Sequence, residues 1–133
     1  MWKRVLLIGS ILIFLSGCKM QTNEREKLRD LEYTIIEKED APEELVRILE
    51  EKEKNEFKLT FEEEESLYLC VGYGEQKTSG YSIAVRELYL SENAIYFDTN
   101  LIGPGKEEKV AQSPSYPWLI VKTEYVDKPV VFQ

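Results

Sequence analysis

The chain of 133 residues contains no histidine and only two cysteines, Cys18 and Cys70. Without histidine it lacks the usual general base near neutral pH, the usual partner of serine and cysteine nucleophiles, and the commonest transition-metal ligand. Four successive glutamates at positions 62–65 do not reproduce the spaced ligands of a calcium loop. The sequence therefore predicts a protein that is not an enzyme and that binds no metal and no cofactor.

The chain also has fewer basic than acidic residues. The chain has 17 lysines and arginines against 25 aspartates and glutamates, a net charge of −8. A surplus of negative charge disfavours binding to nucleic acid and to anionic lipid headgroups. It favours solubility and a basic protein partner, and we expect no nucleic acid among the partners.

A long apolar run is absent as well. The longest one, Val5 to Leu15, follows Lys3 and Arg4, and it is shorter than the roughly 20 apolar residues that cross a bilayer. A charged head, a short apolar stretch and then small residues are typical of a secretory signal. We expect residues 1–17 to be removed from the mature protein.

The sequence Leu-Ser-Gly-Cys at positions 15–18 resembles the lipobox of bacterial lipoproteins. This resemblance implies that residues 1–17 are a lipoprotein signal peptide and that Cys18 carries acyl chains such as palmitate at the new N-terminus. Residues 18–30 are mostly polar and would form a lipid-anchored tether, on the extracytoplasmic face of a bacterial membrane. The alternatives are an ordinary signal peptide followed by an unrelated cysteine, or a short amphipathic membrane anchor.

After cleavage, 15 basic and 25 acidic side chains remain, a net charge of −10. If Cys18 is acylated, Cys70 has no partner for a disulfide within the chain. The domain must then be held together by its core. The sequence leaves open whether the Cys70 thiol is buried.

One helix is predicted near the start of the domain, which we place at residues 31–133. Asp40 can cap it, Glu43 is the capping-box partner three residues later, and Pro42 lies in the first turn, where its missing N–H does no harm. Apolar residues at helical spacing form one stripe, consisting of Leu45, Ile48, Leu49 and Val46.

The rest of the domain has the pattern of short strands separated by turns. They are expected over residues 33–36, 56–61, 67–71, 81–90, 94–101, 116–125 and, as a short edge strand, 130–132. The apolar parity shifts between Val85 and Leu88, which indicates a bulge. The predicted fold class is α+β and β-dominant, with one N-terminal amphipathic helix followed by a mostly antiparallel sheet or small sandwich.

Two loops stand out by their glycines. Gly72 and Gly74 permit close backbone approach or a bulge, and Gly80 permits a positive φ in a turn. Gly-Pro-Gly at positions 103–105 is a strong turn signal. The spacing excludes a phosphate-binding loop, because there is no G-x-x-x-x-G-K and no following helix.

Three segments of the domain form a recognisable set: YLCVGYGEQKTSGYSI at 68–83, Gly-Pro-Gly at 103–105 and SYPWLIVK at 115–122. Together they resemble the protease complex subunit PrcB family. Ser79 stands where glycine is usual, and Ile102 stands where a proline would begin the second loop. The resemblance covers the chain from about Leu31 onward. It implies a bacterial lipoprotein that is an accessory or stabilising subunit of a surface protease.

A shorter similarity links the same loops to chagasin-type cysteine protease inhibitors. The matching segments are 77–81, 103–105 and 116–118, in the order in which that family presents its three inhibitory loops. The asparagine, the first proline and the arginine of that pattern are absent. An inhibitor requires all three loops to lie exposed at one end of the domain, whereas an accessory subunit can use any face.

The favoured function is therefore a non-catalytic protein-binding module on a lipid tether, with protease inhibition as the alternative. Tyrosine and tryptophan dominate interface hot spots, although each aromatic residue here could instead pack in the core. The predicted partner-binding residues are Tyr73, Lys77, Thr78, Gly80, Tyr81, Pro104, Tyr116 and Trp118.

Overall fold

A computed structural model describes residues 26–133 of the chain. The predicted signal peptide, Cys18 and most of the tether lie outside these residues. Within residues 26–133, no helix is long and apolar enough to cross a membrane. The same residues contain no group of three or more cysteine, aspartate or glutamate side chains placed to hold a metal ion.

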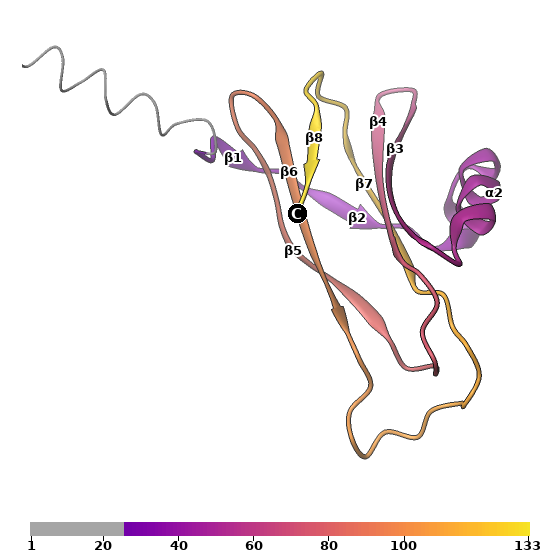
Figure 1. Cartoon of the computed structure of the whole chain (residues 1–133). Helices are drawn as coiled ribbons and strands as arrows, with labels where there is room; N and C mark the ends of the chain where they lie inside the picture. Colours follow the sequence, from indigo (N-terminus) through magenta and orange to yellow (C-terminus); the bar gives the residue numbers. More distant parts are fainter. Residues whose placement is uncertain (1–25) are drawn as a thin grey trace, which may run out of the picture.

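Two four-stranded sheets face each other as a sandwich (Figure 1). Sheet A has the order β1 (Arg29–Asp30), β5 (Ser82–Leu90), β6 (Ile95–Ile102) and β8 (Val130–Phe132), and sheet B has the order β2 (Tyr33–Ile35), β7 (Trp118–Glu124), β4 (Ser66–Tyr73) and β3 (Glu56–Glu63). All neighbours are antiparallel except β6 and β8, which are parallel. The predicted β-dominant class is confirmed, and of the two expected arrangements the sandwich is the one observed.

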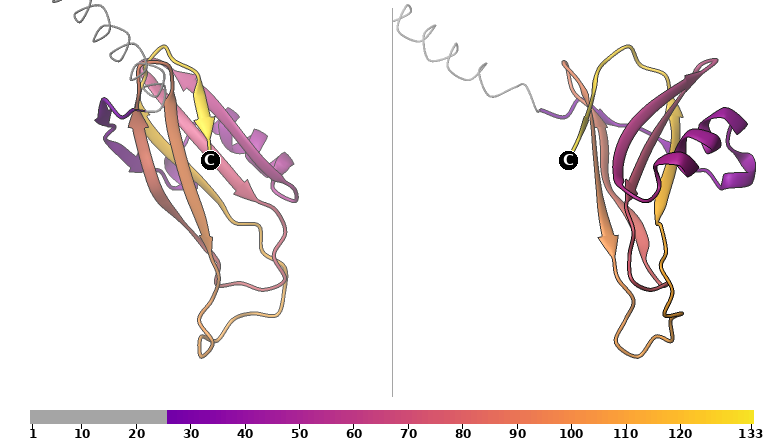
Figure 2. Two further views of the ribbon diagram at one scale, coloured as in Figure 1. Left: turned by 60° about the vertical axis from the view of Figure 1, so that its left-hand side comes forward. Right: turned by 45° about the vertical axis from the view of Figure 1, so that its right-hand side comes forward.

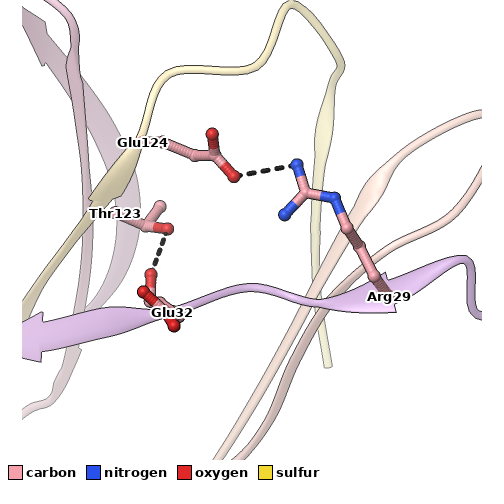
Figure 3. Close-up of polar contacts among 4 residues, drawn as sticks. All are labelled: Arg29, Glu32, Thr123 and Glu124. Atoms are coloured by element: carbon pink, nitrogen blue, oxygen red, sulfur yellow. Dashed lines mark hydrogen bonds and ion pairs between the residues drawn. The ribbon is translucent and has the colours of Figure 1, made fainter.

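The N-terminal segment passes from sheet A to sheet B between β1 and β2. Leu31, at the crossing, is only 3% exposed and enters the core between the sheets. Arg29 forms an ion pair with Glu124 at 2.8 Å, and the Thr123 hydroxyl donates to the Glu32 carbonyl at 2.7 Å (Figure 3). Both contacts join the crossing segment to β7, so the first strand is fastened to both layers.

Strand β4 lies at the centre of the molecule and is buried on both faces. One face packs into the core between the sheets, together with apolar residues of β5, β6 and β7. The other face is covered by α2 (Glu43–Lys52), whose Leu45 and Leu49 are fully buried against Tyr68, Cys70 and Ile120. This double burial explains why residues 67–71 read as a nearly continuous apolar run.

The predicted helix is present, but its capping box is not. Asp40 ends a 3-10 turn, η2 (Lys38–Asp40), and the N-cap of α2 is Pro42, with no side-chain cap hydrogen bond. The reason is local, because a residue before proline is driven to extended backbone, and Ala41 has φ −89° and ψ 157°. That extended residue moves Asp40 too far from the first helical turn to cap it.

Strand β1 was not predicted, because it lies at the end of the expected tether and yet pairs with β5. The other strands agree with the predicted ranges to within about two residues, the usual uncertainty of element ends. The predicted bulge is present in β5, where the register shifts between Val85 and Glu87. The expected close approach at Gly72 is also present, because a Cβ there would lie 2.1 Å from Cε2 of Phe57. The Phe57 ring therefore packs against the backbone of the neighbouring strand at Gly72.

Candidate partner-binding site

Two long loops lie side by side at one end of the sandwich. They are residues 74–81, between β4 and β5, and residues 103–117, between β6 and β7 (Figures 1 and 2). We call these two segments the loop end. The chain enters sheet A at the opposite end, where Arg29 pairs with Leu90, the last residue of β5. The strands thus separate the loop end from the N-terminal connection.

Hydrogen bonds join the two loops into one unit. Gln76 and Ser115 exchange backbone bonds of 2.8 and 3.0 Å. The Ser115 hydroxyl donates to the Thr78 carbonyl at 2.6 Å. The Ser79 amide donates to the Ala111 carbonyl at 3.1 Å, and the Ala111 amide donates to the Ser79 hydroxyl at 2.8 Å. Each loop is therefore positioned by the other.

Gly80 makes this close packing possible. Its φ is +94°, in the region that favours glycine. A Cβ at this position would lie 2.7 Å from Cγ1 of Val110 and 2.9 Å from Cβ of Pro104. The positive φ predicted for Gly80 is confirmed. Its missing side chain lets the two loops come into contact at this point.

Tyr81, in the motif at 68–83, contacts the Gly-Pro-Gly motif at 103–105. A Cβ on Gly103 would lie 3.4 Å from Cε1 of the Tyr81 ring. Tyr81 and Pro104 are both half-buried, so their side chains serve contacts within the loop end as well as its surface.

The motif at 115–122 contacts the motif at 68–83 through a tyrosine and a carboxylate. The Tyr116 hydroxyl donates to Oε1 of Glu75 at 3.2 Å. Desolvation, together with the hydrogen bond and negative charge of Glu75 and the charge of Glu53, raises the pKa of Tyr116. The hydroxyl therefore stays protonated and remains a donor at physiological pH.

Trp118 links the loop end to the helix layer. Its Nε1 donates to Oε2 of Glu53, the residue that follows α2, at 3.0 Å. The ring is half-buried against the apolar cluster beneath α2. Trp118 therefore contributes to packing, and only part of it is available to a partner.

The other predicted residues occupy different environments. Tyr73 points between the sheets, where its hydroxyl lies 2.6 Å from Oγ1 of Thr99. Lys77 is exposed on the surface of the loop end, and Thr78 is half-buried with its hydroxyl donating to the Ser79 carbonyl at 3.0 Å. The structure thus brings Lys77, Thr78, Gly80, Tyr81, Pro104 and Tyr116 together, with Tyr73 beneath them and Trp118 beside them.

Several residues that organise the loop end were not identified from the sequence. They are Glu53, Glu75, Gln76, Ser79, Ala111 and Ser115, of which four lie in the quoted motifs without having been predicted as partner-binding residues. Most act through small polar side chains or the backbone across more than 30 residues of sequence. The serines on both sides of Pro114 mark a turn-rich loop, but they give no indication of its partner.

The segment that builds this end resembles a known protein family. Residues 67–124 match the model of the PrcB C-terminal family. Over these residues the chain is similar to the PrcB C-terminal family. The PrcB C-terminal match runs from β4 to β7 and includes the whole loop end, whereas α2 precedes it and β8 follows it. The resemblance inferred from the three motifs is confirmed, and it suggests a subunit associated with a protease complex.

No curated protein and no solved structure matches the chain.

Proposed function

We propose that this protein is a lipid-anchored extracytoplasmic lipoprotein that acts as a non-catalytic accessory or stabilising subunit of a surface protease. In this proposal the loop end is the surface that contacts the protease. The observation that carries it is the gathering of three sequence motifs, far apart along the chain, into one hydrogen-bonded unit within the PrcB C-terminal match.

The position of the N-terminal connection supports this arrangement. Strand β5 has nine residues, and a strand rises about 3.3 Å per residue, so the loop end lies roughly 30 Å from the point where Arg29 joins sheet A. A lipid on Cys18 would hold that opposite end near the membrane and present the loops away from it. Confinement to the surface would raise the effective concentration near a membrane-bound protease.

The rigidity of the loop end also favours recognition. Loops that are already fixed lose less conformational entropy on binding than mobile ones. Bonds between Gln76, Ser79, Thr78, Ala111 and Ser115 hold the backbone of both loops. Exposed Lys77 and half-buried Tyr116 then supply a charged contact and an aromatic contact of the kind found at interfaces.

The test is a pull-down from the native membrane with the lipidated full chain as bait, read by mass spectrometry. Lys77→Glu and Tyr116→Ala change the surface of the loop end, and Lys128→Glu is the matched charge reversal near the opposite end. We expect one surface protease to be recovered by the wild type and by Lys128→Glu, and to be lost in the other two variants. Failure to enrich any protease would overturn the proposal, and equal recovery by all variants would exclude the loop end as the contact.

A second candidate function, inhibition of a cysteine protease, is favoured by one observation. The segments 77–81, 103–105 and 116–118 lie at the same end of the sandwich, as an inhibitor that enters a cleft requires (Figure 2). Assay against a papain-class protease separates the two functions. An accessory subunit leaves its activity unchanged, whereas an inhibitor lowers it in proportion to the amount added, and Lys77→Glu or Tyr116→Ala weakens the effect.

A further inference from the structure

Strand β8 covers only part of the edge of β6. It pairs with Ile95 to Phe97 and then ends (Figure 1). The rest of β6, residues 98–102, pairs with β5 on one side. On its other side, no strand within residues 26–133 pairs with it. Residues 98–102 of β6 therefore form an open sheet edge.

Some backbone N–H and C=O groups of residues 98–102 point away from β5, toward the open edge. The Ile95 amide donates to the Pro129 carbonyl at 2.9 Å, just before β8. The Phe97 carbonyl accepts from the Gln133 backbone amide at 2.8 Å, just after β8. Alternate residues of a strand direct their N–H and C=O groups to the same side. Thr99 and Leu101 thus direct both groups to the open edge, where they can pair with an added strand.

A hollow of about 420 Å³ continues from the end of β8. It is lined by Glu56, Phe57, Lys58, Val71, Gly72, Tyr73 and Gln133. Two of its lining residues contact β6, since the backbone amide of Gln133 donates to the Phe97 carbonyl and the Tyr73 hydroxyl bonds to the Thr99 hydroxyl. The hollow therefore adjoins the open edge. Val71, which is only 2% exposed, is one of its apolar lining residues.

We propose that the open edge of β6 and this hollow form a docking site for an extended segment of a partner protein. The segment adds as a strand beside Thr99 and Leu101 and places an apolar side chain over Val71. In this mode of recognition, backbone hydrogen bonds provide affinity and the pockets for alternate side chains provide specificity. The segment is neutral or basic, because the chain has a net charge of −8. This site does not depend on the proposed contact at the loop end.

A second copy of this chain fits the edge less well. Two β6 edges could pair antiparallel, but each would contribute only residues 98–102. A stable dimer interface takes about 20–30 residues from each copy, whereas an extended segment is recognised through a few backbone bonds and a side-chain pocket. An extended segment of another protein uses the same hydrogen bonds and also fills the hollow.

In the first experiment, the added strand is fused to the full chain itself, and the protein is purified in detergent. The sequence Val-Thr-Val-Thr is appended after Gln133, so that continuation of the β8 register places both valines over the hollow. The control appends Val-Pro-Val-Pro, which keeps the valines but removes the two N–H groups that would face Thr99 and Leu101. We expect Val-Thr-Val-Thr, and not the control, to slow hydrogen exchange of the Leu101 amide by about tenfold. Equal exchange in the two proteins would overturn the proposal.

The second experiment adds the strand from outside. The free peptide acetyl-Lys-Val-Thr-Val-Thr-Lys-amide is titrated into the full chain and followed by the amide NMR signals of Thr99 and Leu101. Saturable shifts are expected in the wild type, and their loss is expected in Leu101→Pro and in the protein carrying the appended strand. Absence of saturable shifts would overturn the proposal. Shifts that depend on protein concentration without peptide would also overturn it, because they would identify a second copy as the occupant.

Discussion

Tyr73 and Thr99 join the two sheets of the sandwich through a hydrogen bond of 2.6 Å between their hydroxyl oxygens. Tyr73 is the last residue of β4 in sheet B, and Thr99 lies in β6 of sheet A. The bond lies between the core and the loop end, and both residues are half-buried. It therefore fixes the separation of the sheets where the loops begin.

Replacement of Tyr73 by Phe is expected to lower the free energy of unfolding by about 0.5–1.5 kcal/mol. The ring remains, but the Thr99 hydroxyl loses its partner in a partly desolvated place. Urea denaturation followed by circular dichroism measures the change. Tyr125→Phe is the control, because the Tyr125 hydroxyl bonds to Asp127 on the exposed surface. A loss as large in Tyr125→Phe would contradict the special role given to the bond between the sheets.

Gly80→Ala is expected to destabilise the loop end by about 1–3 kcal/mol. The new Cβ would have to accept a φ of +94° and would lie 2.7 Å from a methyl group of Val110. Gly105→Ala is the matched control in the second loop, because a Cβ there has nothing within 4 Å. Thermal unfolding distinguishes the two. Equal melting temperatures would show that the loops separate without cost.

Burial of Cys70 predicts a pH dependence of stability. Desolvation raises the pKa of its thiol from 9.0 to about 12, so between these values the unfolded chain releases a proton that the folded chain retains. The folded state binds more protons there, and stability falls as pH rises. The slope from this one group is at most about 1.4 kcal/mol per pH unit.

The measurement is the free energy of unfolding from pH 8 to pH 10.5, in wild type and in Cys70→Val. The valine variant has no thiol to titrate, so its stability is expected to fall less over this range. Parallel curves for the two proteins would show that the Cys70 thiol is accessible to water in the folded state.

Much of the fold follows from local patterns in the sequence. Alternating Phe57, Leu59 and Phe61 predict the half-buried strand β3, and the shift of parity after Val85 predicts the bulge in β5. The helix is predicted by its apolar stripe, which tertiary packing uses directly. Its start was wrongly assigned to a cap at Asp40, because the effect of Pro42 on the preceding residue outweighs the capping motif.

The site was harder to predict because its contacts are not local. Gly80 signals a turn, but only the fold shows that the turn packs on Pro104 and Val110. Tyrosine is a residue type common at interfaces, whereas Tyr73 lies between the two sheets. The pairing of Gln76 with Ser115 depends on β4 and β7 being neighbours in sheet B, a topology that no short motif encodes.

Coupling between the two loops gives the last prediction. The Ser115 hydroxyl bonds to the Thr78 carbonyl at 2.6 Å, close to the backbone pairing of Ser115 with Gln76. Ser115→Ala removes the side-chain bond and leaves the backbone pairing possible. Because the loops are peripheral to the core, we expect a loss of only about 0.5–1.5 kcal/mol in global stability.

The diagnostic effect of Ser115→Ala is local. Amide hydrogen exchange is expected to quicken at Gln76 and Ser79, while core amides such as that of Leu69 keep their protection. Recovery of the protease in the pull-down should fall at the same time, since a loosened loop must be ordered again on binding. Ser113→Ala, an exposed neighbour, is the matched control and should change neither. Faster exchange with undiminished recovery would show that the rigidity of the loop end serves folding and does not contribute to binding.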